Sequence, residues 1–169
     1  MGKQIWKPGN MLYPLPAVMV STGDTKGNTN ILTIAWTGTV CTNPAMAYIS
    51  VRPERYSYGM LRETGEFVIN LTTEKLAWAA DYCGVRSGRD VDKFASFEQH
   101  TGKDAGGVPY VTQGTNAWLS CKVVSATDLG THTLFLADVL DGGVLSKAAS
   151  ATYAYYQANI KPKPGAAAA

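Results

Sequence analysis

The sequence predicts a mainly β protein with inserted helices, folded as an antiparallel barrel or sandwich. Two observations support this fold class. Short apolar runs of strand length follow one another with turn-forming clusters between them, which is the order of β-hairpins. Helical patterns gather in the middle of the chain and do not alternate with the strands, as a doubly wound parallel sheet would require.

The strands are predicted from their apolar patterns. The first strand is expected at Ala17–Ser21, and the turn cluster 22–30, with its Gly and Asn residues, leads into Ile31–Trp36 as the second arm of a hairpin. Leu32, Ile34 and Trp36 alternate with Ile31, Thr33 and Ala35, which indicates a strand with one more apolar face. Further strands are expected at Ala45–Val51 and Phe67–Leu71.

Two helices are expected around this last strand. Ser57 is a candidate N-cap for a short helix that ends at Gly65, where a glycine suits the left-handed position after a helix. A second helix is expected after a cap at Thr72 or Thr73, with a stop at Gly84.

The remaining segments complete the predicted domain. A helical turn is expected at Lys93–Gln99, and strands are expected at Ala117–Ser125 and Thr133–Leu140. With 169 residues, the chain has room for one domain, which we place at 1–158. The Pro-rich and Ala-rich segment 159–169 resembles a linker or a cloning remnant.

Composition excludes several functional classes. The net charge of +2 is too small to indicate a nucleic-acid-binding or anionic-membrane-binding surface. Cys41, Cys83 and Cys121 lack metal-ligand spacing, so no metal site is expected, and we predict that they are buried apolar residues of a cytoplasmic protein. The Rossmann, Walker, HExxH and GxSxG motifs are absent, as is any apolar run long enough for a membrane helix.

Two loops carry the residue types that bind anions. Arg52, Arg55 and Ser57 follow one apolar strand, and a second group, Ser87, Arg89 and Lys93, follows the second helix. A phosphate group needs cationic and hydroxyl donors gathered at one place, and each loop supplies both. The alternative is a pair of solvated turns with surface arginines.

Two further features have both a functional and a structural interpretation. In the segment Ile34–Thr42, small residues around Gly38 let the backbone approach a flat ligand, or form a glycine bulge at a barrel corner. His132, before the last strand, is a candidate proton donor or a solvated turn residue. Several aromatic residues either line a site or fill the core: Trp36, Tyr56, Tyr58, Trp78 and Tyr82.

Four segments, taken in order, resemble the flavin reductase-like family of FMN-binding split barrels. They are PLPAVMVSTGD (14–24), NILTIAWTGTVCTNPAMAYISVRPERYSYGMLRETGEFVINL (30–71), SGRDVDKF (87–94) and GTHTLFLADV (130–139). The family includes flavoredoxins, NAD(P)H:flavin oxidoreductases and the flavin domain joined to rubredoxin in some anaerobes. The resemblance implies an antiparallel split barrel that forms a homodimer, with FMN near the subunit interface.

The resemblance also implies a set of site residues. Ala35, Trp36, Thr37, Gly38 and Thr39 would hold the isoalloxazine ring. Arg52, Arg55, Tyr56, Ser57 and Tyr58 would lie along the ribityl phosphate, and Ser87, Gly88, Lys93 and Phe94 would close over it. His132 would lie near the flavin and the nicotinamide.

The function implied is that of an FMN-binding oxidoreductase. It would take hydride or electrons from NADH, NADPH or a protein donor and pass them to free flavin, a rubredoxin or another electron-transfer protein. One alternative is an electron shuttle without its own nicotinamide site, and another is a split barrel that binds no flavin.

Overall fold

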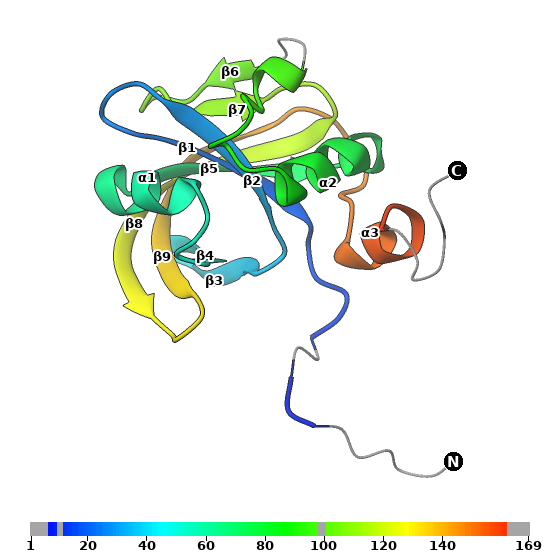
Figure 1. The fold of residues 1–169 in the computed structure, drawn as a ribbon, viewed down its shortest axis with the longest axis horizontal. Helices are drawn as coiled ribbons and strands as arrows, with labels where there is room; N and C mark the ends of the chain where they lie inside the picture. Colours follow the sequence, from blue (N-terminus) through cyan, green and yellow to red (C-terminus); the bar gives the residue numbers. More distant parts are fainter. Residues whose placement is uncertain (1–6, 10–11, 98–100, 162–169) are drawn as a thin grey trace.

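In the described part of the chain, the fold is a coiled, seven-stranded antiparallel sheet with three α-helices (Figure 1). A computed structural model describes residues 7–9, 12–97 and 101–161. The sheet order is β2-β1-β5-β8-β9-β4-β3, and a separate hairpin pairs β6 with β7. The strands are β1 Val18–Gly23, β2 Thr29–Ile34, β3 Thr37–Thr42, β4 Ala45–Val51, β5 Glu66–Thr72, β6 Thr101–Lys103, β7 Pro109–Val111, β8 Thr115–Asp128 and β9 Thr133–Val144. The α-helices are α1 Ser57–Thr64, α2 Ala77–Val85 and α3 Tyr153–Asn159, and the short 3-10 turns are η1 Glu74–Leu76 and η2 Ala95–Phe97. The predicted fold class, mainly β and antiparallel with inserted helices, is confirmed.

The first hairpin forms as predicted because its turn is held by its own side chains. The Asp24 carboxylate accepts hydrogen bonds from the backbone N–H groups of Lys26 and Asn28. Gly27 has a φ of 88°, which a glycine adopts without strain. β1 and β2 then pair in register from Val18 opposite Ile34 to Gly23 opposite Thr29.

The strand predicted over Ile31–Trp36 begins and ends two residues earlier than expected. β2 ends at Ile34 and a separate strand, β3, begins at Thr37, so the chain turns a corner at 35–36. The Ser50 N–H donates to the Trp36 carbonyl at 2.8 Å and ties this corner to β4. The register of β3 shifts between Thr39 and Cys41, so the irregularity lies beside the predicted glycine bulge rather than at Gly38.

Both faces of β1 are buried, which explains its continuous apolar sequence. Val18 and Val20 point into the barrel core, whereas Met19 packs on the opposite face with Ala80 and Cys83 of α2. Cys83 and Cys121 are buried as predicted, and burial raises the pKa of each thiol to about 12. Cys41 is only half-buried.

The helix ends differ in detail from the prediction. Tyr56, not Ser57, is the residue before α1, and no side chain caps this helix. Gly65 closes α1 in the left-handed conformation, as predicted. Thr73 precedes η1 but donates its hydroxyl to the Gly114 carbonyl, and α2 continues through Gly84 to Val85.

Three elements fall where no regular structure was predicted. The glycine-rich segment around 102–107 forms the β6–β7 hairpin, and α3 follows β9 and lies beside α2 (Figure 1). Of the predicted turn Lys93–Gln99, η2 forms at Ala95–Phe97 and the last two residues lie outside the described part. The predicted linker 159–169 is described only as far as Lys161 and stays a prediction. No helix in the described residues is long and apolar enough to cross a membrane.

Candidate functional site

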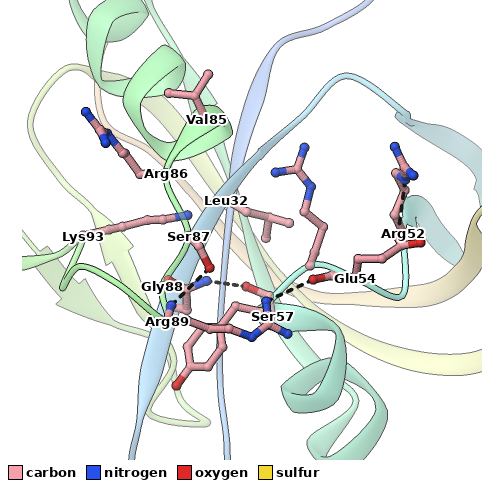
Figure 2. A pocket seen from close by; sticks show the side chains of 13 residues that line it. Leu32, Arg52, Glu54, Ser57, Val85, Arg86, Ser87, Gly88, Arg89 and Lys93 are labelled. Atoms are coloured by element: carbon pink, nitrogen blue, oxygen red, sulfur yellow. Dashed lines mark hydrogen bonds and ion pairs between the residues drawn. The ribbon is translucent and has the colours of Figure 1, made fainter.

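The two basic loops predicted from the sequence border one cavity of about 320 Å³ (Figure 2). One loop connects β4 to α1 and the other follows α2, while β2 supplies the wall between them. The lining residues are Asn30, Leu32, Arg52, Glu54, Arg55, Tyr56, Ser57, Val85, Arg86, Ser87, Gly88, Arg89 and Lys93. Segments far apart in the sequence therefore meet at one place.

The charge of this cavity favours an anionic ligand. Four arginines and one lysine line it, against a single carboxylate, that of Glu54. Glu54 lies 3.4 Å from Arg52 in an exposed ion pair, a kind of pair that contributes little to stability. The excess of guanidinium groups is typical of sites that bind phosphate through charge-assisted hydrogen bonds.

Two of the arginines are held in place by backbone carbonyls. Arg55 donates to the Gly84 carbonyl at 2.9 Å, and Arg89 donates to the Glu54 carbonyl at 3.1 Å. The Arg89 guanidinium also lies 5.6 Å from the centre of the Tyr56 ring, within cation–π range. Because a guanidinium has five N–H donors, each arginine keeps donors for a ligand after making these contacts.

A buried contact between three segments fixes the spacing of the two loops. The Asn30 side-chain amide of β2 donates to the Ser57 hydroxyl at 2.8 Å, and both residues are almost fully buried. Gly88 packs against Asn30 and Tyr56 so closely that a Cβ built there would lie 2.7 Å from Asn30 Cγ. The Ser57 side chain therefore lies behind the cavity surface, where it joins the loop to β2.

Lys93 has a similar anchoring position. Its Nζ donates to the carbonyls of Ile31 and Cys83, each at 2.9 Å, and the residue is 4% exposed. Burial lowers the pKa of Lys93 from its ordinary value. The ammonium group thus ties β2 to α2 beneath the cavity.

A second, smaller cavity of about 100 Å³ continues from the first. Leu32, Arg52 and Arg55 line both cavities. The second cavity reaches the β2–β3 corner at Ala35 and Trp36, and His132 closes its other side. The His132 Nδ1 lies 2.9 Å from the Thr131 hydroxyl.

The structure thus gathers many of the predicted site residues along two connected cavities. These residues are Ala35, Trp36, Arg52, Arg55, Tyr56, Ser57, Ser87, Gly88, Lys93 and His132. Phe94 instead lines another cavity, which shares Gly88, Arg89 and Lys93 with the first. The sequence-based set did not include Asn30, Val85 and Arg86, which line the first cavity, although Asn30 is a conspicuous polar residue at the start of an apolar run.

The other predicted residues lie outside the two cavities. Thr37 donates its hydroxyl to the Tyr48 carbonyl, and Gly38 faces the Tyr48 ring. The Tyr58 hydroxyl lies 3.0 Å from the Thr133 hydroxyl, and the Tyr58 ring packs edge-on against Phe135. Thr39, like Thr37 and Gly38, pairs with β4.

Comparison with known proteins places this arrangement in a family. The chain is 35% identical over 121 residues to a ferric-chelate reductase (NAD(P)H) of Archaeoglobus fulgidus, and this match covers 71% of this chain and 70% of the relative. It is 29% identical over 118 residues to a high molecular weight rubredoxin of Moorella thermoacetica, covering 69% of this chain and only about half, 51%, of the relative. The flavoredoxin of Desulfovibrio vulgaris has a similar structure, with a TM-score of 0.76, 29% identity and coverage of 85% of this chain and 76% of the other. The Flavin reductase like domain model matches residues 11–163, so the chain belongs to the flavin reductase-like family.

Proposed function

We propose that the protein is an FMN-binding oxidoreductase that takes hydride or electrons from NAD(P)H or a protein donor. Free flavin or an electron carrier would receive them. One observation supports the proposal most directly: the cavity lined by five cationic side chains continues past Arg52 and Arg55 to the Ala35–Trp36 corner and His132. A ligand with a phosphate at one end and a planar ring at the other matches this layout.

The donor set of the first cavity fits a flavin phosphate. Arg52, Arg55 and Arg89 offer guanidinium N–H groups, and Ser87 offers a hydroxyl. The absence of a side chain at Gly88 leaves room for the close packing of the loop on which two of these residues lie. When bound, FMN supplies the hydride and single-electron chemistry.

The residues around the second cavity would orient the reacting partners. The backbone at Ala35 and Trp36 offers amide groups to a ring edge, and His132 lies where it can donate a proton or stabilise negative charge. Thr131 restricts the rotation of the His132 ring through its contact with Nδ1. The protein would thereby contribute binding, orientation and electrostatics.

A homodimer is part of the proposal. Large apolar side chains on β8 and β9 are exposed, with Val124 at 51%, Leu140 at 65% and Val144 at 82%. Exposed apolar residues on neighbouring strands are typical of association surfaces. Light scattering coupled to size-exclusion chromatography would measure the mass, and a monomer at micromolar concentration would contradict this part.

The similarity to a flavoredoxin and to a high molecular weight rubredoxin favours a second candidate function, an electron shuttle. A shuttle would hold FMN without a nicotinamide site and exchange electrons with a rubredoxin or another electron-transfer protein. Anaerobic mixing of the FMN-loaded protein with NADH, and separately with NADPH, distinguishes the two functions. An enzyme loses its visible flavin absorbance with one of these donors, whereas a shuttle keeps it with both.

The flavin assignment is tested by removing two cations from the cavity. An Arg52→Ala/Arg89→Ala double variant should raise the Kd for FMN at least tenfold, because charge-assisted hydrogen bonds to the phosphate are lost. Arg62→Ala is the matched control, since Arg62 lies exposed in the last turn of α1. Equal retention of FMN in the double variant and the control would contradict the phosphate site. Failure of the unaltered protein to take up FMN would contradict the proposed function.

A further inference from the structure

A third cavity, of about 260 Å³, opens between α2 and α3 beside the site described above. It shares Ala35 and Trp36 with the second cavity and Arg55 with both of the others. A ligand bound there would lie next to the corner where we place the flavin ring. We propose that this cavity binds a planar, conjugated electron acceptor of the quinone class, an inference that rests on the proposed function.

The walls of the cavity suit a flat ring. Trp36, Tyr153, Tyr155 and Tyr156 supply aromatic faces and edges. The lining also includes five alanines, whose side chains are small: Ala17, Ala35, Ala77, Ala80 and Ala151. An aromatic slot next to these small side chains admits a thin ring system more readily than a bulky aliphatic ligand.

The polar groups suit a ligand whose oxygens accept hydrogen bonds. Arg55 and Lys161 are cationic, and Tyr153 and Tyr155 add hydroxyl groups. The one carboxylate of the lining, that of Asp81, accepts a hydrogen bond from the Tyr156 hydroxyl at 2.7 Å. A quinone presents two carbonyl oxygens and no donor, which matches a lining rich in donors.

The third cavity is preformed because α3 is held at several points. The Thr152 hydroxyl accepts a hydrogen bond from the Tyr155 N–H and caps the helix. The Tyr153 N–H donates to the Leu15 carbonyl at 2.7 Å, and the Tyr156–Asp81 hydrogen bond joins α3 to α2. The third cavity has a volume of about 260 Å³, which is smaller than that of the first cavity. A cavity of this size suits a single ring system and not a whole dinucleotide.

The chemistry of the acceptor balances with the donor of the proposed function. Reduction of a quinone to its hydroquinone takes up two electrons and two protons. A hydride from NAD(P)H accounts for both electrons and one proton, and solvent supplies the second proton.

The test measures binding of duroquinone to the FMN-loaded protein by calorimetry, before any donor is added. Duroquinone is fully substituted, so the half-buried thiol of Cys41 has no free ring position to add to. Tyr155→Ala should raise the Kd for duroquinone about 3- to 10-fold, because one aromatic wall is lost. Tyr155→Phe should raise the Kd less than Tyr155→Ala does, because it keeps that wall and removes only one of the hydroxyl donors of the lining. Trp78→Ala is the control, since Trp78 is 72% exposed on the same helix α2 and lies outside the lining.

The outcomes separate this inference from the proposed function. Failure of duroquinone to bind, or equal effects of Tyr155→Ala and Trp78→Ala, overturns the quinone site while leaving FMN uptake intact. Competition between FMN and duroquinone also overturns it, because the cavity would then hold the flavin ring itself. Tighter binding of lumiflavin, a bare flavin ring, than of duroquinone would assign the cavity to free flavin instead. Saturation-transfer NMR from the unaltered protein to duroquinone answers the binding question even where Tyr155→Ala does not fold. A protein that binds duroquinone but no FMN would contradict the proposed function alone.

Discussion

Replacing Gly88 with alanine tests the close packing behind the first cavity. The new Cβ would overlap Asn30 Oδ1 and the edge of the Tyr56 ring and would lie 2.7 Å from Asn30 Cγ. Asn30 is buried and bonded to Ser57, so relief requires a shift of the loop that carries Ser87 and Arg89. Overpacking of this kind costs about 1–3 kcal/mol. For a chain of this size, that cost corresponds to a Tm roughly 2–12 °C lower.

Thermal unfolding followed by circular dichroism measures the stability change, and fluorescence titration measures the Kd for FMN. We expect Gly88→Ala to lower the Tm and to weaken FMN more than riboflavin, which lacks the phosphate. Gly59→Ala is the matched control, because a Cβ at Gly59 in α1 meets nothing within 4 Å. The control should raise stability by about 0.5–1 kcal/mol, as alanine does in a helix. A Gly88→Ala protein with unchanged Tm and unchanged FMN affinity would refute the packing argument.

Three further substitutions test other parts of the site and its surroundings. Lys93→Met leaves the Ile31 and Cys83 carbonyls without their partner and should cost about 2–4 kcal/mol in chemical denaturation; a cost below about 0.5 kcal/mol would contradict the anchoring role. Tyr156→Phe removes the hydrogen bond to Asp81 and should cost about 1 kcal/mol at neutral pH. Burial raises the pKa of Tyr156 from 10.0 to about 12, so the stability this hydroxyl contributes is present below pH 10 and is lost between pH 10 and 12; a constant difference from pH 7 to 12 would argue against it. His132→Ala should slow reduction by NAD(P)H at least about tenfold in stopped-flow measurements while leaving the Kd for FMN nearly unchanged, and an unchanged rate would make His132 a solvated turn residue.

The strands and the basic loops were predictable because their signals are local. The β1–β2 turn contains its own hydrogen-bonding side chains, and the apolar runs of β4, β5 and β9 each identify a strand without reference to the rest of the chain. Arginine and serine next to a strand end mark an anion site by residue type alone. In the structure, the two loops that carry these residues line one cavity.

The elements missed by prediction depend on contacts made elsewhere. At the break between β2 and β3, the Ser50 N–H donates a hydrogen bond to the Trp36 carbonyl. Trp36 belongs to an otherwise continuous apolar pattern, so the local sequence does not predict the break. α3 has only 7 residues, a length at which an isolated helix is unstable, and it forms against Asp81 of α2. The β6–β7 hairpin forms in a glycine-rich segment that local propensity assigns to a loop.

Ser57 shows why residue type predicted the loops that line the cavity but not the contacts that each residue makes there. A serine after two arginines predicts a hydroxyl that donates to phosphate, yet Ser57 is fully buried and its hydroxyl accepts from Asn30, 27 positions away. Gly88, from a third segment, packs against Asn30 and against Tyr56, the residue before Ser57. The distance between the two basic loops is therefore set by a contact of three segments that no local pattern encodes. If the cavity binds phosphate as proposed, its affinity should depend on Asn30 and Gly88 as well as on the arginines, because these two residues help to determine how far apart the two basic loops lie.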